Sequence, residues 1–94
     1  MARVEVAVLM VTYNSCECIE DCLKSVFATG DAVSKQVIVV DNGSSDGTQQ
    51  KIQSGFRDVK LIEAGDNLGF AAGVNLAAKY ADAEFVLLLN PDTV

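Results

Sequence analysis

The stretch VIVVDNGSSDGT (residues 37–48) decides the fold of this chain. Four apolar residues stand in a row, all of them β-branched, and a polar loop that begins at Asp41 follows directly. An unbroken apolar run of this kind is typical of a strand that is buried on both faces in a parallel sheet. The loop contains Ser44, Ser45 and Asp46, which are residue types that begin helices. The stretch therefore predicts a strand, a loop and a helix in succession.

The same succession repeats along the rest of the chain. Further apolar runs predict three more strands, at residues 4–11, 59–62 and 85–89, and the last of them is expected to be buried on both faces. Helices are expected between the strands, because apolar residues recur there at helical spacing. Asn14 and Glu17 have the spacing of an N-terminal capping signal, so we expect the first helix to begin there.

The second and third helices follow from the same periodicity. Ile52 and Phe56 are expected to point inward from the second helix. The third helix is expected to open at Asn67 or Gly69. Its apolar side is expected to consist of Phe70, Val74, Ala77 and Ala78.

The alternation of continuously apolar strands with amphipathic helices predicts an α/β fold. Residues 1–94 form a single domain with a four-stranded, mostly parallel sheet in the order β-α-β-α-β-α-β. Helices should cover both faces of this sheet, which gives a three-layer α/β/α, Rossmann-like half of a doubly wound fold with right-handed crossovers. The order of the strands across the sheet is not visible in the sequence.

Composition excludes several classes of function. A net charge of −6 argues against binding DNA or RNA through the whole surface, although it leaves room for a phosphate ligand held by backbone amides and a metal. The chain has no histidine, and thus lacks the usual general base and the usual zinc ligand. Neither a membrane span nor a signal peptide is visible. We expect a cytoplasmic protein, with a peripheral place at the inner face of the membrane left open for a full-length form.

Three cysteines, Cys16, Cys18 and Cys22, fall within seven residues. An odd number of cysteines without a secretion signal indicates reduced thiols. Cys18 and Cys22 stand four apart on the expected helix, so a shared metal is conceivable. Because no fourth ligand accompanies them, we favour the interpretation that the cysteines fill space in the core or at its boundary.

Polar clusters follow every predicted strand at its carboxyl end, where ligands bind in this architecture. Two of the loops contain glycine and lead into a helix N-terminus, which favours an anion. No GxGxxG or P-loop follows the first strand, so simple phosphate cradling there is not expected. The alternative for each cluster is ordinary turn and cap chemistry, which uses the same residue types. The clusters are TYN (12–14), DNGSSDGT (41–48), DNLG (66–69) and NPD (90–92).

Asp92 is a hard oxygen ligand at a strand end. One carboxylate is too little for a dedicated cation cage, but Mg²⁺ or Mn²⁺ is often held by one or two carboxylates together with substrate phosphates. A diphosphate ligand bridged to Asp92 by such an ion would reconcile an acidic protein with an anionic substrate. The alternative is that Asn90 and Pro91 merely end the strand, because proline cannot donate to a sheet.

Four segments of the chain resemble the family 2 glycosyltransferases of the GT-A type. They are VTYNS (11–15), VVDNGSSDGT (39–48), NLGFAAGVN (67–75) and LLLNPD (87–92), in the order and at the spacing usual for that family. Together they cover nearly the whole chain. The bacterial rhamnosyltransferase-like branch is the most similar, because it often carries NPD where other members carry an Asp-x-Asp motif.

The resemblance implies a site for a nucleoside diphosphate sugar, linked to UDP or dTDP. The segment around Thr12, Tyr13 and Asn14 would line the base and ribose pocket. Asp41 would accept a hydrogen bond from the pyrimidine ring, because a carboxylate pairs with the N–H of uracil or thymine. Gly69 would lie near the nucleotide and permit close approach of the backbone.

The remaining implied residues are less sharply defined. Asn75 would also lie near the nucleotide, although a structural hydrogen bond is an equally good account of it. Asp92 would hold the divalent cation that stabilises the leaving diphosphate. Asn90 replaces the first Asp of the usual Asp-x-Asp, so metal affinity without nucleotide should be poor, and its amide oxygen would contact ribose or metal.

The resemblance also indicates what this chain lacks. Family members are much longer, and their second half completes the sheet, binds the acceptor and supplies the general base of an inverting displacement. No catalytic base can be assigned in these 94 residues, and the glycan or lipid-linked acceptor is unknown. We expect the chain alone to be inactive, and we expect it to form a homodimer through the unfinished edge at residues 85–89.

The sequence leaves one other function open and disfavours another. A non-catalytic nucleotide-binding or self-associating module with the same fold remains open. A phosphoacceptor receiver domain does not fit, because no acidic pair follows the first strand and Asp41 follows the second strand rather than the third.

Overall fold

The computed structural model describes residues 4–28, 34–66 and 68–89, and in these ranges strands and helices alternate as predicted. No helix there is long and apolar enough to cross a membrane. The elements are β1 (Val4–Thr12), α1 (Ile19–Phe27), β2 (Lys35–Asp41), α2 (Thr48–Gly55), β3 (Val59–Glu63), α3 (Phe70–Ala78) and β4 (Ala83–Leu88).

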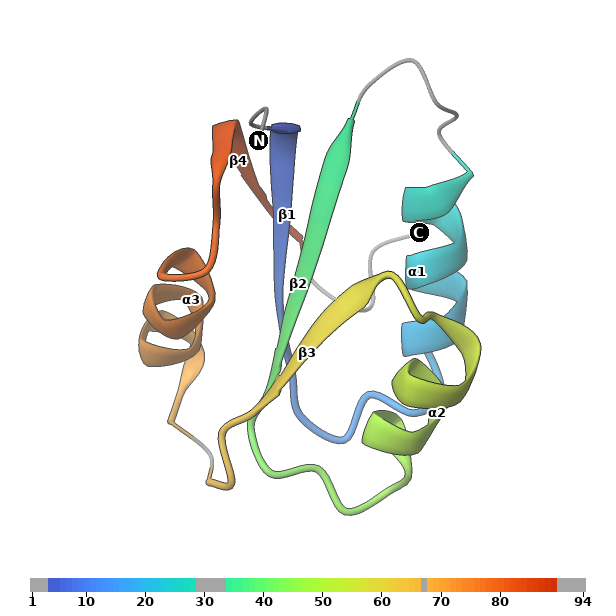
Figure 1. Cartoon of the computed structure of the whole chain (residues 1–94). Helices are drawn as coiled ribbons and strands as arrows, with labels where there is room; N and C mark the ends of the chain where they lie inside the picture. Colours follow the sequence, from blue (N-terminus) through green and yellow to red (C-terminus); the bar gives the residue numbers. More distant parts are fainter. Residues whose placement is uncertain (1–3, 29–33, 67, 90–94) are drawn as a thin grey trace.

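The four strands form one sheet in the order β3-β2-β1-β4 (Figure 1). All three pairs of neighbouring strands are parallel, which confirms the predicted sheet type. The chain moves in one direction across the sheet from β1 to β3 and then returns to place β4 on the other side of β1. The strand order therefore reverses between β1 and β4. Ligands in doubly wound folds bind outside the carboxyl ends of the strands at such a reversal.

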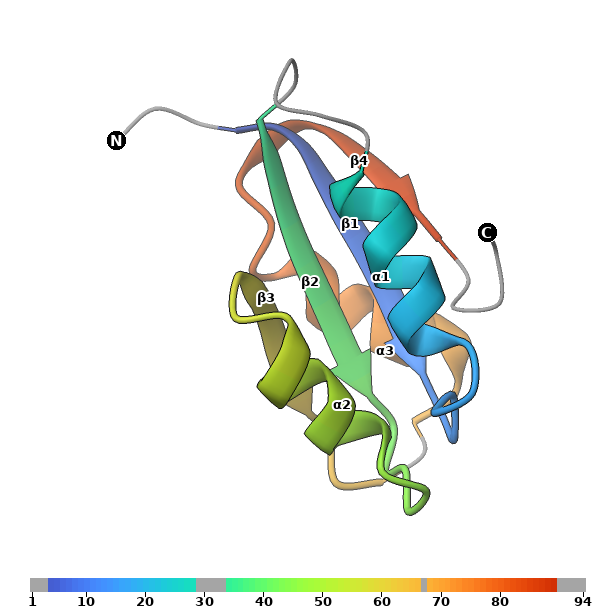
Figure 2. The ribbon, with the colours of Figure 1, turned by 90° about the vertical axis from the view of Figure 1, so that its right-hand side faces the viewer.

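Helices cover both faces of the sheet, which confirms the three-layer arrangement. In Figure 1, α3 lies on one side of the sheet, and α1 and α2 lie on the other. Figure 2 shows α1 and α2 from the front, over β1 and β2. Successive side chains of a strand alternate between faces, so Val8 and Met10 pack with α1 and α2, whereas Ala7 and Leu9 pack with α3. The two central strands are thus buried on both faces.

The helix α3 approaches the sheet through small residues. Gly73 and Ala77 are its buried residues, one turn apart. A Cβ atom on Gly73 would lie 2.9 Å from both γ-methyl carbons of Val11 on β1, so only glycine permits this separation. The predicted apolar side was wrong in part, because Phe70 is 55% exposed and Ala78 is exposed as well. Hydrophobicity alone favoured the phenyl ring, but close packing at Gly73 sets the rotation of the helix.

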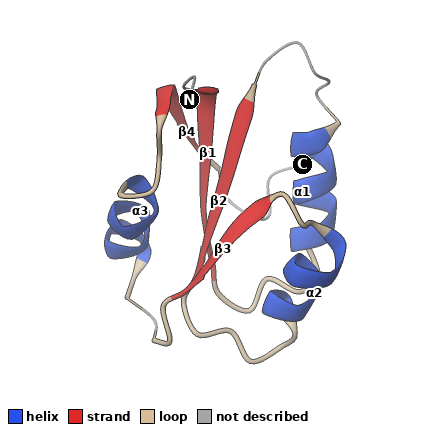
Figure 3. Ribbon diagram, in the orientation of Figure 1, coloured by secondary structure: helices blue, strands red, loops and turns tan. Residues whose placement is uncertain are grey.

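Strand β4 lies at one edge of the sheet, next to β1 (Figure 3). Phe85 is 68% exposed and Leu88 is 49% exposed. The prediction that residues 85–89 form an edge is confirmed, but the prediction of burial on both faces was wrong. The physical reason is that α3 packs over β1 and β2, which leaves the side chains of β4 uncovered by the described residues.

The helices begin differently from the way that the capping pattern predicted. The residue that precedes α1 is Cys18, which makes no side-chain cap, so the capping role expected for Asn14 and Glu17 was wrong. Gly47 precedes α2, and Asp46 accepts the N–H of Thr48, as its helix-starting role predicted. Gly69 precedes α3, in agreement with one of the two expected positions, and Asn67 lies outside the described residues.

None of the three described cysteines forms a disulfide. Cys22 is completely buried in the cluster between α1 and the sheet, which confirms its expected part in the core. Cys16 and Cys18 are partly buried, and both precede α1.

Candidate functional site

The polar loops that follow β1, β2 and β3 gather at one end of the sheet (Figure 1). A Cβ atom on Gly43, in the loop after β2, would lie 3.5 Å from the Cα atom of Asp66 in the loop after β3, so these two loops are in contact. The cluster expected after β4 contains Asn90 and Asp92, which lie outside the described residues. Three of the four predicted clusters are therefore brought to one rim.

The loop after β1 and the loop after β2 are joined by a set of hydrogen bonds. Most of them run from a backbone N–H of one loop to a side-chain oxygen of the other, so they depend on the residue types present. The acceptors are Ser44 Oγ for the Asn14 N–H (2.8 Å), Asn14 Oδ1 for the Ser45 N–H (2.9 Å), Thr48 Oγ1 for the Ser15 N–H (2.9 Å) and Asp46 Oδ2 for the Cys16 N–H (3.0 Å). A backbone bond from the Asn42 N–H to the Thr12 carbonyl (2.8 Å) adds to these. The two loops thus form one preorganised unit before any ligand binds.

Asn14 connects the two loops through both its backbone and its side chain. Its φ angle is +50°, in the left-handed region that asparagine tolerates better than most residues. Its backbone N–H donates to Ser44 Oγ, and its side-chain Oδ1 accepts the N–H of Ser45. The predicted nucleotide contact of Asn14 stays a prediction.

Asp41 is buried beneath the loops, with none of its surface exposed. Its carboxylate accepts hydrogen bonds from Thr12 Oγ1 (2.7 Å), Ser44 Oγ (2.5 Å), the Ser44 N–H (2.9 Å) and Gln49 Nε2 (2.6 Å). Burial raises the pKa of Asp41, but the hydrogen bonds from Ser44, Gln49 and Thr12 together outweigh burial and hold the pKa below 3.8. The carboxylate is therefore charged at neutral pH. The predicted contact between Asp41 and a pyrimidine ring stays a prediction, and in this structure neighbouring donors occupy both carboxylate oxygens.

Thr12 and Tyr13 differ sharply in their access to a ligand. Thr12 is completely buried and donates to Asp41, so it supports the loops from below. Tyr13 is 52% exposed at the end of β1, next to the reversal in strand order. Of these two predicted residues, Tyr13 is the one that offers its side chain to solvent.

Asn42 is a candidate that the sequence analysis missed. It is 2% exposed, and its Nδ2 donates to the carbonyl of Gly69 at 3.2 Å. Its Oδ1 has no hydrogen-bond partner among the described residues. A buried acceptor without a partner costs free energy, which is recovered when a ligand or water donates to it. The sequence could have indicated Asn42, because successive side chains of a strand point to opposite faces of the sheet. If Asp41 points to one face at the strand end, Asn42 points to the other.

Gly69 lies at this rim, whereas Asn75 points away from the sheet. Gly69 has a φ of +83°, immediately before α3, and its carbonyl ties α3 to Asn42. Asn75 is exposed, and it lies on the side of α3 opposite to the buried residues Gly73 and Ala77. The structure brings Gly69 into the candidate site but does not bring Asn75 toward the sheet, so a nucleotide contact of Asn75 stays a prediction.

A cation cage is not present in the part of the chain that the structure describes. There, no three side chains of His, Cys, Asp or Glu lie together in a way that could hold a metal ion. The expected carboxylate, Asp92, cannot be placed relative to the loops, because it lies outside the described residues.

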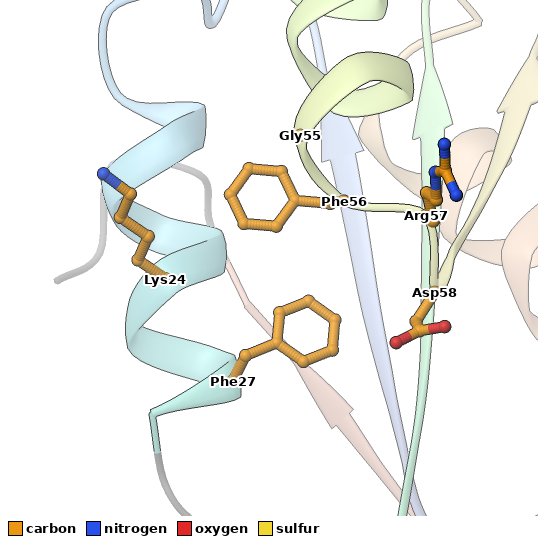
Figure 4. Close-up of a pocket in the computed structure, with 6 residues that line it drawn as sticks. All are labelled: Lys24, Phe27, Gly55, Phe56, Arg57 and Asp58. Carbon is orange, nitrogen blue, oxygen red and sulfur yellow. The ribbon is translucent and has the colours of Figure 1, made fainter.

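The cavity shown in Figure 4 lies away from the polar loops, at the C-terminal ends of α1 and α2. Its volume is about 390 Å³. Two phenyl rings lie in it with their centroids 6.1 Å apart and their planes at 14°. Because no cluster from the sequence analysis reaches this cavity, it is not the site that the strand ends form. Its lining consists of Lys24, Phe27, Gly55, Phe56, Arg57 and Asp58.

Comparison with known families identifies the class of protein. Residues 7–94 match the sequence profile of Glycosyl transferase family 2. The chain belongs to this family of glycosyltransferases, which confirms the resemblance carried by the four motifs.

Curated relatives include the poly-beta-1,6-N-acetyl-D-glucosamine synthase of Staphylococcus epidermidis, which is 33% identical over 91 residues. That alignment covers 95% of this chain and 22% of the relative. The enzyme of the same name from Staphylococcus aureus strain COL is 34% identical over 89 residues, with 92% of this chain and 21% of the relative covered. The chain thus spans about a fifth of the length of these relatives.

Solved structures show the same fold. S. aureus TarS 1-349 in complex with UDP has a TM-score of 0.85 and 30% identity, over 94% of this chain and 27% of that chain. TarS 1-349 in complex with UDP-GlcNAc has a TM-score of 0.85 and 31% identity, over 94% of this chain and 26% of that chain. The mannosyltransferase PcManGT from Pyrobaculum calidifontis, in complex with GDP-Man and Mn²⁺, has a TM-score of 0.84 and 28% identity. The match covers 98% of this chain and 28% of that chain. These TM-scores show that the chain shares the fold of its neighbours, so the predicted α/β fold is confirmed.

Proposed function

We propose that this chain is the donor-binding portion of a glycosyltransferase that takes a sugar from a UDP- or dTDP-linked donor. The observation that carries the proposal is the preorganised pair of loops at the carboxyl edge of the sheet, next to the reversal in strand order. Membership of the family supports it, and so do the neighbours described with UDP and UDP-GlcNAc.

The nucleotide is proposed to lie against the rim between β1 and the start of α3. The exposed ring of Tyr13 provides a face on which a base can stack. The unpartnered Oδ1 of Asn42 suits an N–H of a pyrimidine such as uracil or thymine. Thr12, Asn14, Gly69 and Asn75 are retained as proposed nucleotide-site residues, with Thr12 in a supporting position because it is buried.

The diphosphate is proposed to be held through a divalent cation at Asp92, with Asn90 nearby. Mg²⁺ and Mn²⁺ suit a single carboxylate that is supplemented by phosphate oxygens. When bound, the ion would stabilise the charge on the leaving nucleoside diphosphate. One structural neighbour is described with Mn²⁺ and GDP-Man, which supports this choice of metals.

The complete reaction is proposed to be an inverting transfer to a glycan or lipid-linked acceptor. No carboxylate among the described residues can be assigned as its general base, so we propose that a residue outside this chain supplies it. The 94 residues alone are then expected to bind the donor without transferring the sugar. We further propose that the reaction takes place in the cytoplasm, where nucleotide sugars are made.

Titration calorimetry with UDP, dTDP and GDP, each with and without Mn²⁺, tests the donor site. We expect selective binding of the pyrimidine nucleotides that is strengthened by Mn²⁺. Alanine at a residue that stacks on a base costs about 1–3 kcal/mol, so Tyr13→Ala should weaken UDP binding by about 5- to 150-fold.

Tyr80→Ala is the matched control, because Tyr80 is also exposed but follows α3, away from the loops. It should leave the affinity unchanged. Equal weakening by both substitutions, or no binding of any nucleotide by the unchanged chain, would refute the proposed site.

Self-association through β4 is a second proposal, and the exposed side chains of this strand favour it. Four apolar side chains of this strand are about half exposed or more: Phe85 (68%), Val86 (55%), Leu87 (50%) and Leu88 (49%). An edge strand with apolar side chains on both faces readily pairs with another chain. We propose a homodimer that forms through this edge.

A further inference from the structure

The cavity at the C-terminal ends of α1 and α2 is a hollow that the proposed donor site does not use. Its volume of about 390 Å³ lies within the range of about 300–1,000 Å³ that is usual for ligand pockets. Nothing lies within 4 Å of a Cβ atom added to Gly55, so this part of the wall faces open space. All the lining residues are exposed except Phe56, which is partly buried. The cavity is therefore open to solvent and can admit a side chain of another molecule.

Two phenyl rings form the apolar part of the wall. Phe27 ends α1 and Phe56 follows α2, and the planes of their rings are nearly parallel, at 14°. Because the centroids are 6.1 Å apart, the rings are offset, and each of them leaves part of its face uncovered by the other. Phe27 is 38% exposed. The face of an aromatic ring is the negative side of its quadrupole, so the two rings favour a cation.

The charged groups around the rings do not all face them (Figure 4). The Asp58 carboxylate turns toward the ring of Phe27. The Lys24 ammonium and the Arg57 guanidinium point away from the two rings, and Lys24 is engaged by Glu20 of the same helix at 3.3 Å. Asp58 makes no hydrogen bond or ion pair with any other residue that the structure describes. An unpartnered carboxylate thus lies beside the aromatic faces.

Two further features of the fold favour a cation in this cavity. Helices α1 and α2 both end there, and the C-terminal end of a helix carries a partial negative charge, roughly half an elementary charge. No basic residue in the last turn of α2 offsets this charge. The chain as a whole has a net charge of −6, which attracts cationic partners and repels anionic ones.

We propose that this cavity binds the guanidinium group of an arginine side chain that belongs to a partner polypeptide. The planar guanidinium stacks on the faces of Phe27 and Phe56, and its N–H groups donate to Asp58. A guanidinium suits the site better than an ammonium, because it is planar, more weakly hydrated and able to bond a carboxylate while it stacks. The cavity then docks a basic partner away from the polar loops, and this inference does not depend on the proposed donor site.

Titration with three short peptides, followed by the amide resonances in NMR spectra, tests the proposal. Each peptide is blocked at both ends and carries one residue between two glycines: arginine, lysine or citrulline, which has nearly the shape of arginine without its charge. We expect the arginine peptide to shift the N–H resonances of Gly55, Phe56 and Asp58 and to leave those of Asn14 and Ser45 in place.

The relative affinities of the three peptides decide the chemistry of the site. The citrulline peptide should bind about 3- to 30-fold more weakly than the arginine peptide, because it loses both the cation–π contact and the ion pair. The lysine peptide should also bind more weakly than the arginine peptide. Equal binding of the arginine and citrulline peptides, or shifts confined to the polar loops, would overturn the proposal.

Substitutions of the charged lining residues separate a cation site from an anion site. Asp58→Asn should weaken the arginine peptide by up to about fivefold, as for loss of an exposed ion pair. Arg57→Gln should bind it at least as tightly, because a like charge is removed. Glu17→Gln is the matched control, since it removes the same charge at an exposed position before α1, at the other end of that helix, and it should leave the affinity unchanged. A larger loss for Arg57→Gln than for Asp58→Asn would contradict a cation site.

The aromatic contact is tested at Phe27. Phe27→Leu keeps an apolar side chain but removes the ring face, so it should weaken the arginine peptide by about 2- to 5-fold, whereas Phe27→Tyr should retain the affinity. Phe70→Leu is the control, because Phe70 is also exposed but begins α3, on the other side of the sheet (Figure 1). Equal effects of Phe27→Leu and Phe70→Leu would overturn the stacking. Circular dichroism of each variant checks that the fold is kept.

Discussion

Among single residues, Asp41 and Asp46 hold the loops through ionised carboxylates. A hydrogen bond from Thr48 lowers the pKa of Asp46 most, and backbone N–H groups such as that of Cys16 add to it. For Asp41, burial raises the pKa, but the hydrogen bonds from Ser44, Gln49 and Thr12 prevail and lower it. Both carboxylates thus ionise more readily in the folded chain than at their ordinary pKa of 3.8.

The stability of the chain should therefore depend on pH in a defined direction. A carboxylate with a lowered pKa in the folded state stabilises that state above its unfolded pKa, and the contribution is lost as the pH falls through the folded value. We expect the contribution of Asp41 to be constant from pH 7 to about pH 5, to begin to fall near the unfolded pKa of about 3.9, and to be lost as the pH falls through the lower pKa of the folded state.

Urea unfolding of the unchanged chain and of Asp41→Asn, at a series of pH values, measures this contribution. The difference in the free energy of unfolding between the two should narrow below about pH 4. Other carboxylates titrate in both proteins, so the difference isolates Asp41. A difference that stayed constant down to pH 2 would contradict a lowered pKa.

At the level of elements, α3 is positioned by one glycine. Gly73 is buried against Val11, and a Cβ atom there would lie 2.9 Å from each of the two methyl carbons. Val11 is β-branched and stiff, so it cannot turn aside easily. The helix also carries Gly69, whose carbonyl binds Asn42, so displacement of α3 would disturb the candidate site.

Gly73→Ala should destabilise the chain by about 1–3 kcal/mol, the usual cost of overpacking a core. A loss of 1 kcal/mol lowers the melting temperature of a domain of this size by roughly 4–8 °C. Thermal unfolding followed by circular dichroism measures the change.

Gly55→Ala is the matched control, because nothing lies within 4 Å of a Cβ atom added there and this glycine ends α2. Its melting temperature should stay the same or rise slightly. Combining Gly73→Ala with Val11→Ala should recover part of the loss, because the clash is removed. An equal loss for Gly55→Ala and Gly73→Ala would show that close packing of α3 is not the cause.

At the level of the whole molecule, the proposed dimer rests on the exposed side chains of β4. Its side chains alternate between the two faces of the sheet: Leu87 is paired with Val8, on the α1 and α2 side, and Leu88 is paired with Leu9, on the α3 side. Full burial of such a side chain contributes about 1.5–3 kcal/mol. Several half-exposed side chains together can offset the cost of association.

The chain should therefore shift from monomer to dimer as its concentration rises, and Leu87→Lys should keep it monomeric. Analytical ultracentrifugation over a wide range of concentrations measures the distribution. Leu68→Lys is the control, because Leu68 is similarly exposed, at 44%, but lies in the loop before α3. A monomeric unchanged chain at all concentrations would contradict the dimer.

Much of the fold could be predicted because its signals are local. The apolar runs and the polar residues that end them located every strand within a few residues, because a run of apolar, largely β-branched residues favours a strand whether or not both of its faces are later covered. The capping prediction at Asn14 failed because its side chain is used by Ser45, which is 31 residues away in the sequence. The burial predicted for Phe70 failed because the rotation of α3 depends on the contact between Gly73 and Val11.

The sequence by itself determined the kind of sheet, the succession of elements and the rim at which polar residues gather, because each of these follows from residues close together in the chain. Only the tertiary structure decided the strand order, with its reversal between β1 and β4. It also decided which polar side chains are used internally, as Asp41 is, and which keep an unpartnered atom, as Asn42 does. The physical reason is that hydrogen-bond donors and covering helices come from distant segments, and their positions are fixed only when the layers pack.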